Sequence, residues 1–206
     1  MSVKLSKGSK LSLAKGPKAG PQNVILGLGW DAGEEVVEQR SGGFLGFGGR
    51  VERQTVKRSI DLDASCVVLD GSNQVVDTVW FRQLASRDGS IVHSGDNRTG
   101  DGDGDDEQIR VNLSSVPRSA QTLVFTINSF SGESFSQIKN ASCRLLDGDS
   151  NAELARYDLS GGGSHTALIM AKLVREGDGW GVEAIGQQAS GRTFHDLMPT
   201  ILTALR

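Results

Sequence analysis

The sequence predicts an all-β protein, and more narrowly an antiparallel β-sandwich. Most of its apolar runs are short and stop at turn signals such as GSNQ and RDGS, which is typical of sandwiches and barrels. The chain has 27 glycines but only 4 prolines, as expected when tight turns join many short elements. Its 206 residues also suit one sandwich domain.

The expected strands begin close to the N-terminus. Val3 with Leu5, and Leu11 with Leu13, alternate with polar residues and predict two short strands of an edge hairpin. A denser apolar run that ends at Trp30 predicts a buried strand. Further strands are expected at residues 64–70, 75–81, 91–94, 109–113, 122–128, 141–146, 154–159, 167–175 and 180–186.

Two segments depart from this pattern. Residues 33–59 have acidic, glycine-aromatic and basic thirds without a sustained period, which predicts an inserted loop. Its Phe44, Leu45 and Phe47 form either a docking tip for a membrane or partner, or a lid that folds back on the core. We therefore expect a sandwich domain over residues 1–190 that contains this insertion.

Residues 191–206 predict an amphipathic helix, packed on the domain or serving as a partner-binding tail. Thr193 and Asp196 suit its N-terminal cap, whereas Pro199 either kinks it or marks a later start. The apolar positions have helical spacing: Phe194, Leu197, Met198, Ile201, Leu202 and Leu205.

Composition excludes several classes of protein. No apolar stretch approaches the ~18 residues of a membrane span, and the N-terminus lacks the apolar core of a secretory signal, so we expect a cytoplasmic location. The N-terminal lysines suit a charged edge strand, with a nucleic-acid or lipid patch as the alternative; few aromatic residues and no broad basic face argue against nucleic acid.

Cys66 and Cys143 lie in apolar runs, which predicts buried thiols.

One stretch, GDNRTGDGDGDDE at residues 95–107, carries a strong local excess of negative charge. Six carboxylates and one arginine give it a formal charge of −5, in a chain whose total is −3. Two carboxylates about 4 Å apart repel by roughly 4 kcal/mol at an effective dielectric constant near 20. A bound cation reverses that cost, so the stretch predicts a metal site.

The ligand types favour calcium. Asp101, Asp103 and Asp105 alternate with glycines, so that three carboxylates can converge on one ion. All are hard oxygen ligands without cysteine or histidine, which makes calcium the first choice and magnesium or manganese the second. The spacing is not that of an EF-hand, because Asp106 stands where the loop needs glycine.

A second acidic group is expected at the same pole. Asp61 and Asp63 project to one side of a strand start, and Asp31 follows directly after the strand that ends in Trp30. Together with the acidic stretch these carboxylates exceed what one calcium ion needs, so two ions are expected. The alternative is that Asp61 caps a turn and Asp63 pairs with an arginine.

The run HSGDNRTGDGDGDDEQIRVNLSSVP, with GLGWD and DLDAS before it and AELARYDLS and EGDGWGVEAIGQ after it, resembles the TerD family of tellurium-resistance and stress proteins. The likeness covers most of residues 2–190. It implies a cytoplasmic bacterial β-sandwich that binds calcium, has no established enzymatic activity and works with other proteins of a stress or tellurite-resistance system.

The resemblance also implies the ligand positions. This chain departs from the family pattern at Ser59 and at residues 127–130, which puts one of two ion sites in doubt. The positions that match the family's ligands are Asp31, Asp61, Asp63, Asp96, Asn97, Asp101, Asp103, Asp105, Asp106 and Glu107.

The leading hypothesis is a calcium-binding module without enzymatic activity, whose metal-ordered loops present a surface to protein partners. Calcium-dependent association with a membrane surface is one alternative. A metal-dependent phosphoesterase is the other, but the chain offers no convincing general base, and metal-saturated carboxylates shuttle protons poorly.

Overall fold

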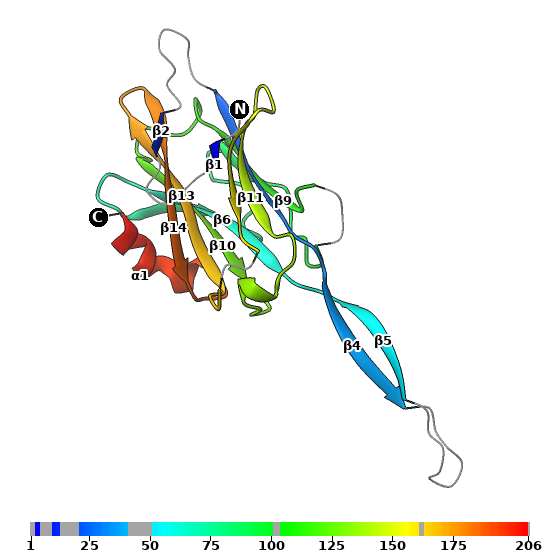
Figure 1. The fold of residues 1–206 in the computed structure, drawn as a ribbon. Coiled ribbons are helices and arrows are strands. Elements are labelled where there is room, and N and C mark those ends of the chain that lie inside the picture. Colours follow the sequence, from blue (N-terminus) through cyan, green and yellow to red (C-terminus); the bar gives the residue numbers. More distant parts are fainter. Residues whose placement is uncertain are drawn as a thin grey trace.

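The structure, a computed structural model, describes residues 3–4, 10–12, 21–40, 51–100, 104–160 and 163–205. Two six-stranded sheets pack face to face, and a two-stranded hairpin projects from them (Figure 1). All strand pairs are antiparallel except β1 with β12. The predicted antiparallel sandwich is therefore confirmed.

Sheet A has the order β1-β12-β11-β3-β9-β8. Its central strand β3 carries the dense apolar run before Trp30, and every residue after Asn23 in it is buried. The strands are β1 (Val3–Lys4), β3 (Asn23–Gly29), β8 (Ile91–His93), β9 (Glu107–Asn112), β11 (Ser142–Asp147) and β12 (Glu153–Asp158).

Sheet B has the order β2-β14-β13-β10-β6-β7. The two N-terminal strands were expected to pair as a hairpin, and this expectation is wrong: β1 joins the edge of sheet A, and β2 joins the edge of sheet B. The strands are β2 (Lys10–Ser12), β6 (Leu62–Leu69), β7 (Val75–Val79), β10 (Thr122–Ser129), β13 (Ala167–Glu176) and β14 (Gly179–Ala189).

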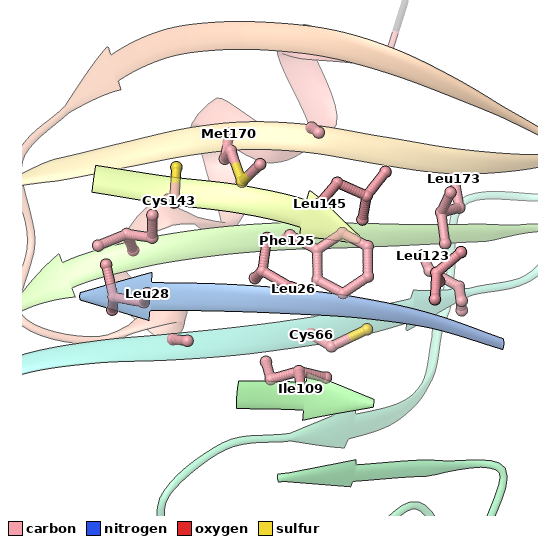
Figure 2. Close-up of a cluster of buried hydrophobic side chains, with 14 of the residues drawn as sticks. Leu26, Leu28, Cys66, Ile109, Leu123, Phe125, Cys143, Leu145, Met170 and Leu173 are labelled. Atoms are coloured by element: carbon pink, nitrogen blue, oxygen red, sulfur yellow. The ribbon is translucent and has the colours of Figure 1, made fainter. Parts of the chain in front are cut away.

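The core lies between the inner faces of the two sheets (Figure 2). Alternate residues of each strand point inward, as the period of two requires. Leu26, Leu28 and Ile109 of sheet A meet Phe125 and Met170 of sheet B, and all five are at most 1% exposed. Both cysteines are free and buried in this layer, as predicted.

Strands β6 and β10 are buried along their whole length because the outer face of sheet B is also covered. Helix α1 (Phe194–Ala204) packs there (Figure 1). Its Phe194, Leu197 and Ile201 contact Val67 and Val124 in a second apolar cluster. The predicted helix thus packs on the sandwich.

The N-terminal cap of α1 also follows the prediction. The Asp196 carboxylate accepts the backbone N–H groups of Arg192, at 2.8 Å, and Thr193, at 3.1 Å. Pro199 lies inside the helix, so the helix starts before the proline and lacks one backbone hydrogen bond at that residue.

Two leucines in α1 offer a matched test of this packing. Leu197 is completely buried, whereas Leu202 is 37% exposed. We expect Leu197→Ala to lower the free energy of unfolding by about 2–5 kcal/mol and Leu202→Ala to change it by less than about 1 kcal/mol. Urea unfolding curves measure both; equal effects would contradict the assigned face of the helix.

The insertion is more regular than expected. Strands β4 (Gly33–Arg40) and β5 (Val51–Arg58) pair over their full length as an antiparallel hairpin that extends away from the sandwich (Figure 1). The described side chains beyond Gly33 are exposed, so neither strand shows the alternation of a half-buried strand. Phe44, Leu45 and Phe47 lie outside the described residues.

Candidate metal site

The site lies at the start of β6, which pairs with β10 on one side but lacks a neighbouring strand on the other. Strand β7 pairs with β6 only from Cys66 to Leu69, so Asp61 and Asp63 lie beside an open edge. The loop between β8 and β9 covers this edge, and Glu107 at the start of β9 accepts the backbone N–H of Ala64 at 2.8 Å. This contact brings the acidic stretch against the strand start that carries the two aspartates.

Asp61, Asp63 and Asp96 form the cluster. Each offers a carboxylate oxygen, and these three oxygens lie within 4.8 Å of one another. Asp63 is only 4% exposed, whereas the Asp96 side chain is 27% exposed and pairs with Arg98, whose Nε is 3.1 Å from Oδ2. The cluster therefore has a buried floor and an open side.

Two oxygens in this cluster are buried without any hydrogen-bond partner. They are Asp61 Oδ1 and Asp63 Oδ2, two of the three such side-chain atoms in the described part of the chain. A buried carboxylate oxygen without a partner is costly, because burial removes its water without replacing it. A cation bound between the carboxylates would supply the missing interaction.

The environment makes these carboxylates hard to ionise. Burial, and then the nearby charge of Glu107, raises the pKa of Asp63 to about 8. Burial, followed by the charges of Asp96 and Glu107, raises the pKa of Asp61 to about 6. Burial also raises the pKa of Glu107, so the site favours either protons or a cation.

Glu107 holds the loop in place. Its side chain is fully buried, and Oε1 accepts the backbone N–H of Asn97 at 3.2 Å, in addition to the Ala64 contact of Oε2. His93 Nε2 lies 3.4 Å from Oε2 and 3.2 Å from the Ala64 carbonyl oxygen. His93 is thus buried against a carboxylate of the acidic stretch.

Asn97 and Asp106 shape the loop in a different way. Asn97 Oδ1 accepts the backbone N–H groups of Thr99 and Gly100, at 3.0 and 3.2 Å, and its Nδ2 donates to Asp106 Oδ1 at 2.9 Å. Asp106 Oδ2 accepts the backbone N–H of Trp30 at 2.9 Å. These two predicted ligands connect the loop to itself and to the end of β3.

Asp31 and Asp105 lie outside the three-carboxylate cluster and have protein partners. Asp31 Oδ2 accepts a hydrogen bond of 2.6 Å from Asn140 Nδ2. Asp105, whose side chain is 5% exposed, forms an ion pair with Arg144 through bonds of 2.8 and 3.1 Å. Asp101 and Asp103 lie outside the described residues.

The place of Asp105 gives a test of how the loop packs. An added Cβ at Gly27 would lie 2.2 Å from Asp105 Oδ2, whereas one at Gly71 would lie 3.7 Å from Gln121 Cγ. We expect Gly27→Ala to displace the Asp105–Arg144 pair and to destabilise the fold by about 1–3 kcal/mol. Gly71→Ala is the control for urea unfolding; equal stability of the two variants would contradict the close packing.

One buried acid beside the site gave no signal in the sequence. Glu133 is 6% exposed and accepts hydrogen bonds from Arg58, at 2.7 Å, and from the hydroxyl groups of Ser129 and Ser131. Ser131 Oγ also accepts the backbone N–H of Asp61. An Arg–Glu pair separated by 75 positions follows from strand pairing, which no local motif records.

The positions where the chain departs from the family pattern also lie here. Asn128 is fully buried and stands opposite Asp63 in the β10–β6 register. Its Nδ2 donates to the Gly191 carbonyl oxygen, with an N···O distance of 3.3 Å. This side chain therefore links the strand to the segment before α1.

Comparison with solved structures finds the same architecture in distant proteins. A homologue of telluride resistance protein TerD from Streptomyces coelicolor A3(2) superposes with a TM-score of 0.65 at 19% identity, covering 90% of this chain and 96% of that chain. This likeness supports the fold alone. No helix in the described part of the chain is long and apolar enough to cross a bilayer.

Sequence comparison is more specific. The chain is 45% identical over 205 residues to tellurium resistance protein TerZ of Serratia marcescens, with 98% of each chain covered. It is 37% identical to tellurium resistance protein TerD of the same organism, with 93% of each covered, and 35% identical to stress response protein SCP2 of Bacillus subtilis strain 168, with 96% and 98% covered. The family model of the TerD domain matches residues 1–199, and the chain therefore belongs to the TerD family of tellurium-resistance and stress-response proteins.

Proposed function

We propose that this protein binds a calcium ion between Asp61, Asp63 and Asp96, and acts without enzymatic activity in a tellurium-resistance or stress response. The observation that carries the proposal is the pair of buried, unpartnered oxygens on Asp61 and Asp63. Each of these two carboxylates also offers an oxygen within 4.8 Å of an Asp96 oxygen. In the described part of the chain this is the one cluster of this kind, so we assign one ion to it.

The chemistry of the ligands favours calcium over other metals. All three side chains offer hard carboxylate oxygens, and calcium takes six to eight oxygen ligands in flexible geometry. The open side at Asp96 leaves room for water molecules in the remaining positions. Zinc and copper would prefer nitrogen or sulfur ligands, and the one nearby histidine already contacts Glu107.

We further propose that the ion orders the loop between β8 and β9 as a surface that protein partners of the stress system recognise. Asp96 and Arg98 are exposed residues of that loop, while Asn97 and Glu107 attach it to the sandwich. Calcium bound to both Asp96 and Asp63 would hold the exposed residues of the loop against the buried start of β6.

Calcium titration of chelator-treated protein tests the proposal. At a hundredfold excess over the dissociation constant, calcium should stabilise the fold by about 2.7 kcal/mol, which corresponds to a melting-temperature rise of roughly 5–10 °C for this chain length. Calorimetry should give a stoichiometry of one for the described cluster. Absence of both binding and stabilisation at millimolar calcium would refute the proposal.

Asp31→Asn is the matched control for the position of the ion. Asp31 belongs to the ligand set that the sequence predicts, but its carboxylate is bonded to Asn140. Asp31→Asn should retain calcium binding, whereas Asp61→Asn should weaken it by at least about tenfold. Loss of binding in Asp31→Asn alone would place the ion elsewhere.

A further inference from the structure

We propose that one end of sheet B carries a second binding site, for a phosphate group, formed by Arg82 and Arg192 over a cluster of aromatic rings. The site uses none of the three carboxylates assigned to the calcium ion. It is built from segments that are far apart in the sequence, namely the turn after β7, the turn after β10 and the start of α1.

Four aromatic side chains from these segments form one continuous cluster. The ring centroids are 4.7 Å apart for Trp80 and Phe81, 5.6 Å for Phe81 and Phe130, and 5.2 Å for Trp80 and Phe194, all in edge-to-face contact. Trp80, Phe81 and Phe130 are half-buried. The cluster therefore reaches the surface at the point where the three segments meet.

The two arginines lie over these rings. Arg82 Cζ is 5.5 Å from the ring centroid of Trp80 and 5.3 Å from that of Phe81, and Arg192 Cζ is 5.8 Å from that of Phe130. Both arginines are exposed residues. Since Phe81 contacts Phe130, the rings beneath the two guanidinium groups belong to the same aromatic cluster.

A third group at the same place can donate a hydrogen bond. The ring centroid of His195 lies 3.9 Å from that of Phe194 and 5.2 Å from that of Trp80. Its Nδ1 is 3.5 Å from the Thr193 hydroxyl oxygen, which leaves Nε2 for a ligand. His195 is exposed.

Neither guanidinium group has a carboxylate within ion-pairing distance among the described residues. By contrast, Arg53, Arg58 and Arg144 each have one, at 3.0, 2.7 and 2.8 Å. Asp196, four positions after Arg192, uses its carboxylate to accept backbone N–H groups at the start of α1. The Asp196 carboxylate thus caps the start of the helix. The guanidinium N–H groups of the two arginines are not used in an ion pair with it.

This arrangement fits a phosphate group. A guanidinium held over a ring face is positioned without use of its N–H donors, which remain in its plane for an anion. Arginine and phosphate pair through two parallel, charge-assisted hydrogen bonds. The adjacent ring surface suits a flat or apolar part of the same ligand. Such a phosphate belongs either to a soluble phosphate ester or to a lipid headgroup.

Two assays in the presence of chelator distinguish these sources. Calorimetric titration with AMP and with inorganic phosphate tests the soluble ligands. Co-sedimentation with phosphatidylcholine vesicles, with and without phosphatidic acid, tests the lipid headgroup. We expect saturable binding in at least one assay that weakens as salt is added; absence of binding in both at low salt would overturn the proposal.

Paired variants locate the binding. Arg82→Gln combined with Arg192→Gln should weaken binding by at least about tenfold. The control combines Arg87→Gln with Arg118→Gln, two exposed arginines outside the cluster, and should stay within about twofold of the wild type. Equal binding by both double variants would overturn the site.

Two further variants test whether paired donors are needed in addition to charge, and whether the phosphate site is independent of the calcium site. Arg82→Lys keeps the charge but loses the paired donors, so it should bind with intermediate affinity; its circular dichroism and melting temperature report whether the fold is intact. Asp63→Asn should lose calcium and retain the phosphate ligand. Loss of both would mean that the phosphate depends on the calcium site, which contradicts an independent site.

Discussion

Asp63→Asn is expected to stabilise the metal-free protein and to remove its stabilisation by calcium. In the metal-free protein the Asp63 carboxylate is buried, lacks a partner for Oδ2 and lies near Asp61 and Glu107. A neutral amide of nearly the same size removes the cost of the buried charge. It also removes the charge that attracts the cation.

Thermal unfolding at pH 8, in chelator and in calcium, measures both effects. The wild type should gain roughly 5–10 °C from saturating calcium, whereas Asp63→Asn should melt higher than the wild type in chelator and gain little from calcium. Asp178→Asn, at a side chain that is 91% exposed, is the control and should behave as the wild type. If Asp63→Asn is less stable in chelator and still responds to calcium, the site assignment is wrong.

Calcium binding is expected to strengthen as the pH rises from 6 to 8. Asp63, with a pKa of about 8, and Asp61, with a pKa of about 6, must lose their protons before they bind the ion. The apparent affinity should therefore rise by up to ~10-fold per pH unit in this range. At pH 7 binding should release about one proton per ion.

The metal-free protein should show the opposite trend in stability. Folding raises the pKa of Asp61 and of Asp63 above the unfolded value of about 3.9. The contribution of these two groups to the free energy of unfolding is therefore fully present below that pH. It is lost as the pH rises through about 6 for Asp61 and about 8 for Asp63. The unfolding free energies of the wild type and of Asp63→Asn, measured over the same pH range and subtracted, isolate the contribution of Asp63 from those of the other titratable groups.

Calorimetry in buffers of different ionisation enthalpy measures the released protons. An observed enthalpy that is the same in all buffers at pH 7 would mean that no proton is released. That outcome, or a calcium affinity that does not change between pH 6 and 8, would show that Asp63 is already ionised before the ion binds.

The strand pattern was predictable from the sequence because turns interrupt it frequently. The EGDG segment at residues 176–179, for example, separates two runs of apolar residues, and β13 and β14 pair as a hairpin around it. The sequence around β6 does not predict that both faces of this strand are buried. This burial depends on α1, which begins more than 120 positions later and packs on Val67 and Leu69.

The members of the acidic site were only partly predictable. Asp61 and Asp63 share one side of a strand start, and this local geometry brings them together as expected. Which carboxylates of the GDGDGDD run face the site depends on partners elsewhere. Asp105 pairs with Arg144, 39 positions away, because β11 and β9 both pair with β3.

The β4–β5 hairpin and the site of Arg82 and Arg192 were also not predictable from local sequence patterns. Strands β4 and β5 pair with each other outside the sandwich, so no buried face imposes a period on their sequence. Arg82 and Arg192 are 110 positions apart in the sequence. Their segments follow β7 and β14, and the strand order β14-β13-β10-β6-β7 brings both to one end of sheet B.

The central claim is that one cation lies between Asp61, Asp63 and Asp96. A crystal structure of the full chain grown with manganese in place of calcium, with anomalous scattering data, tests this claim most directly. We predict an anomalous peak with an oxygen of each of the three carboxylates about 2.1–2.6 Å away. A fully loaded crystal whose peak lies instead at Asp31 or Asp105, with these three carboxylates free of metal, would contradict it.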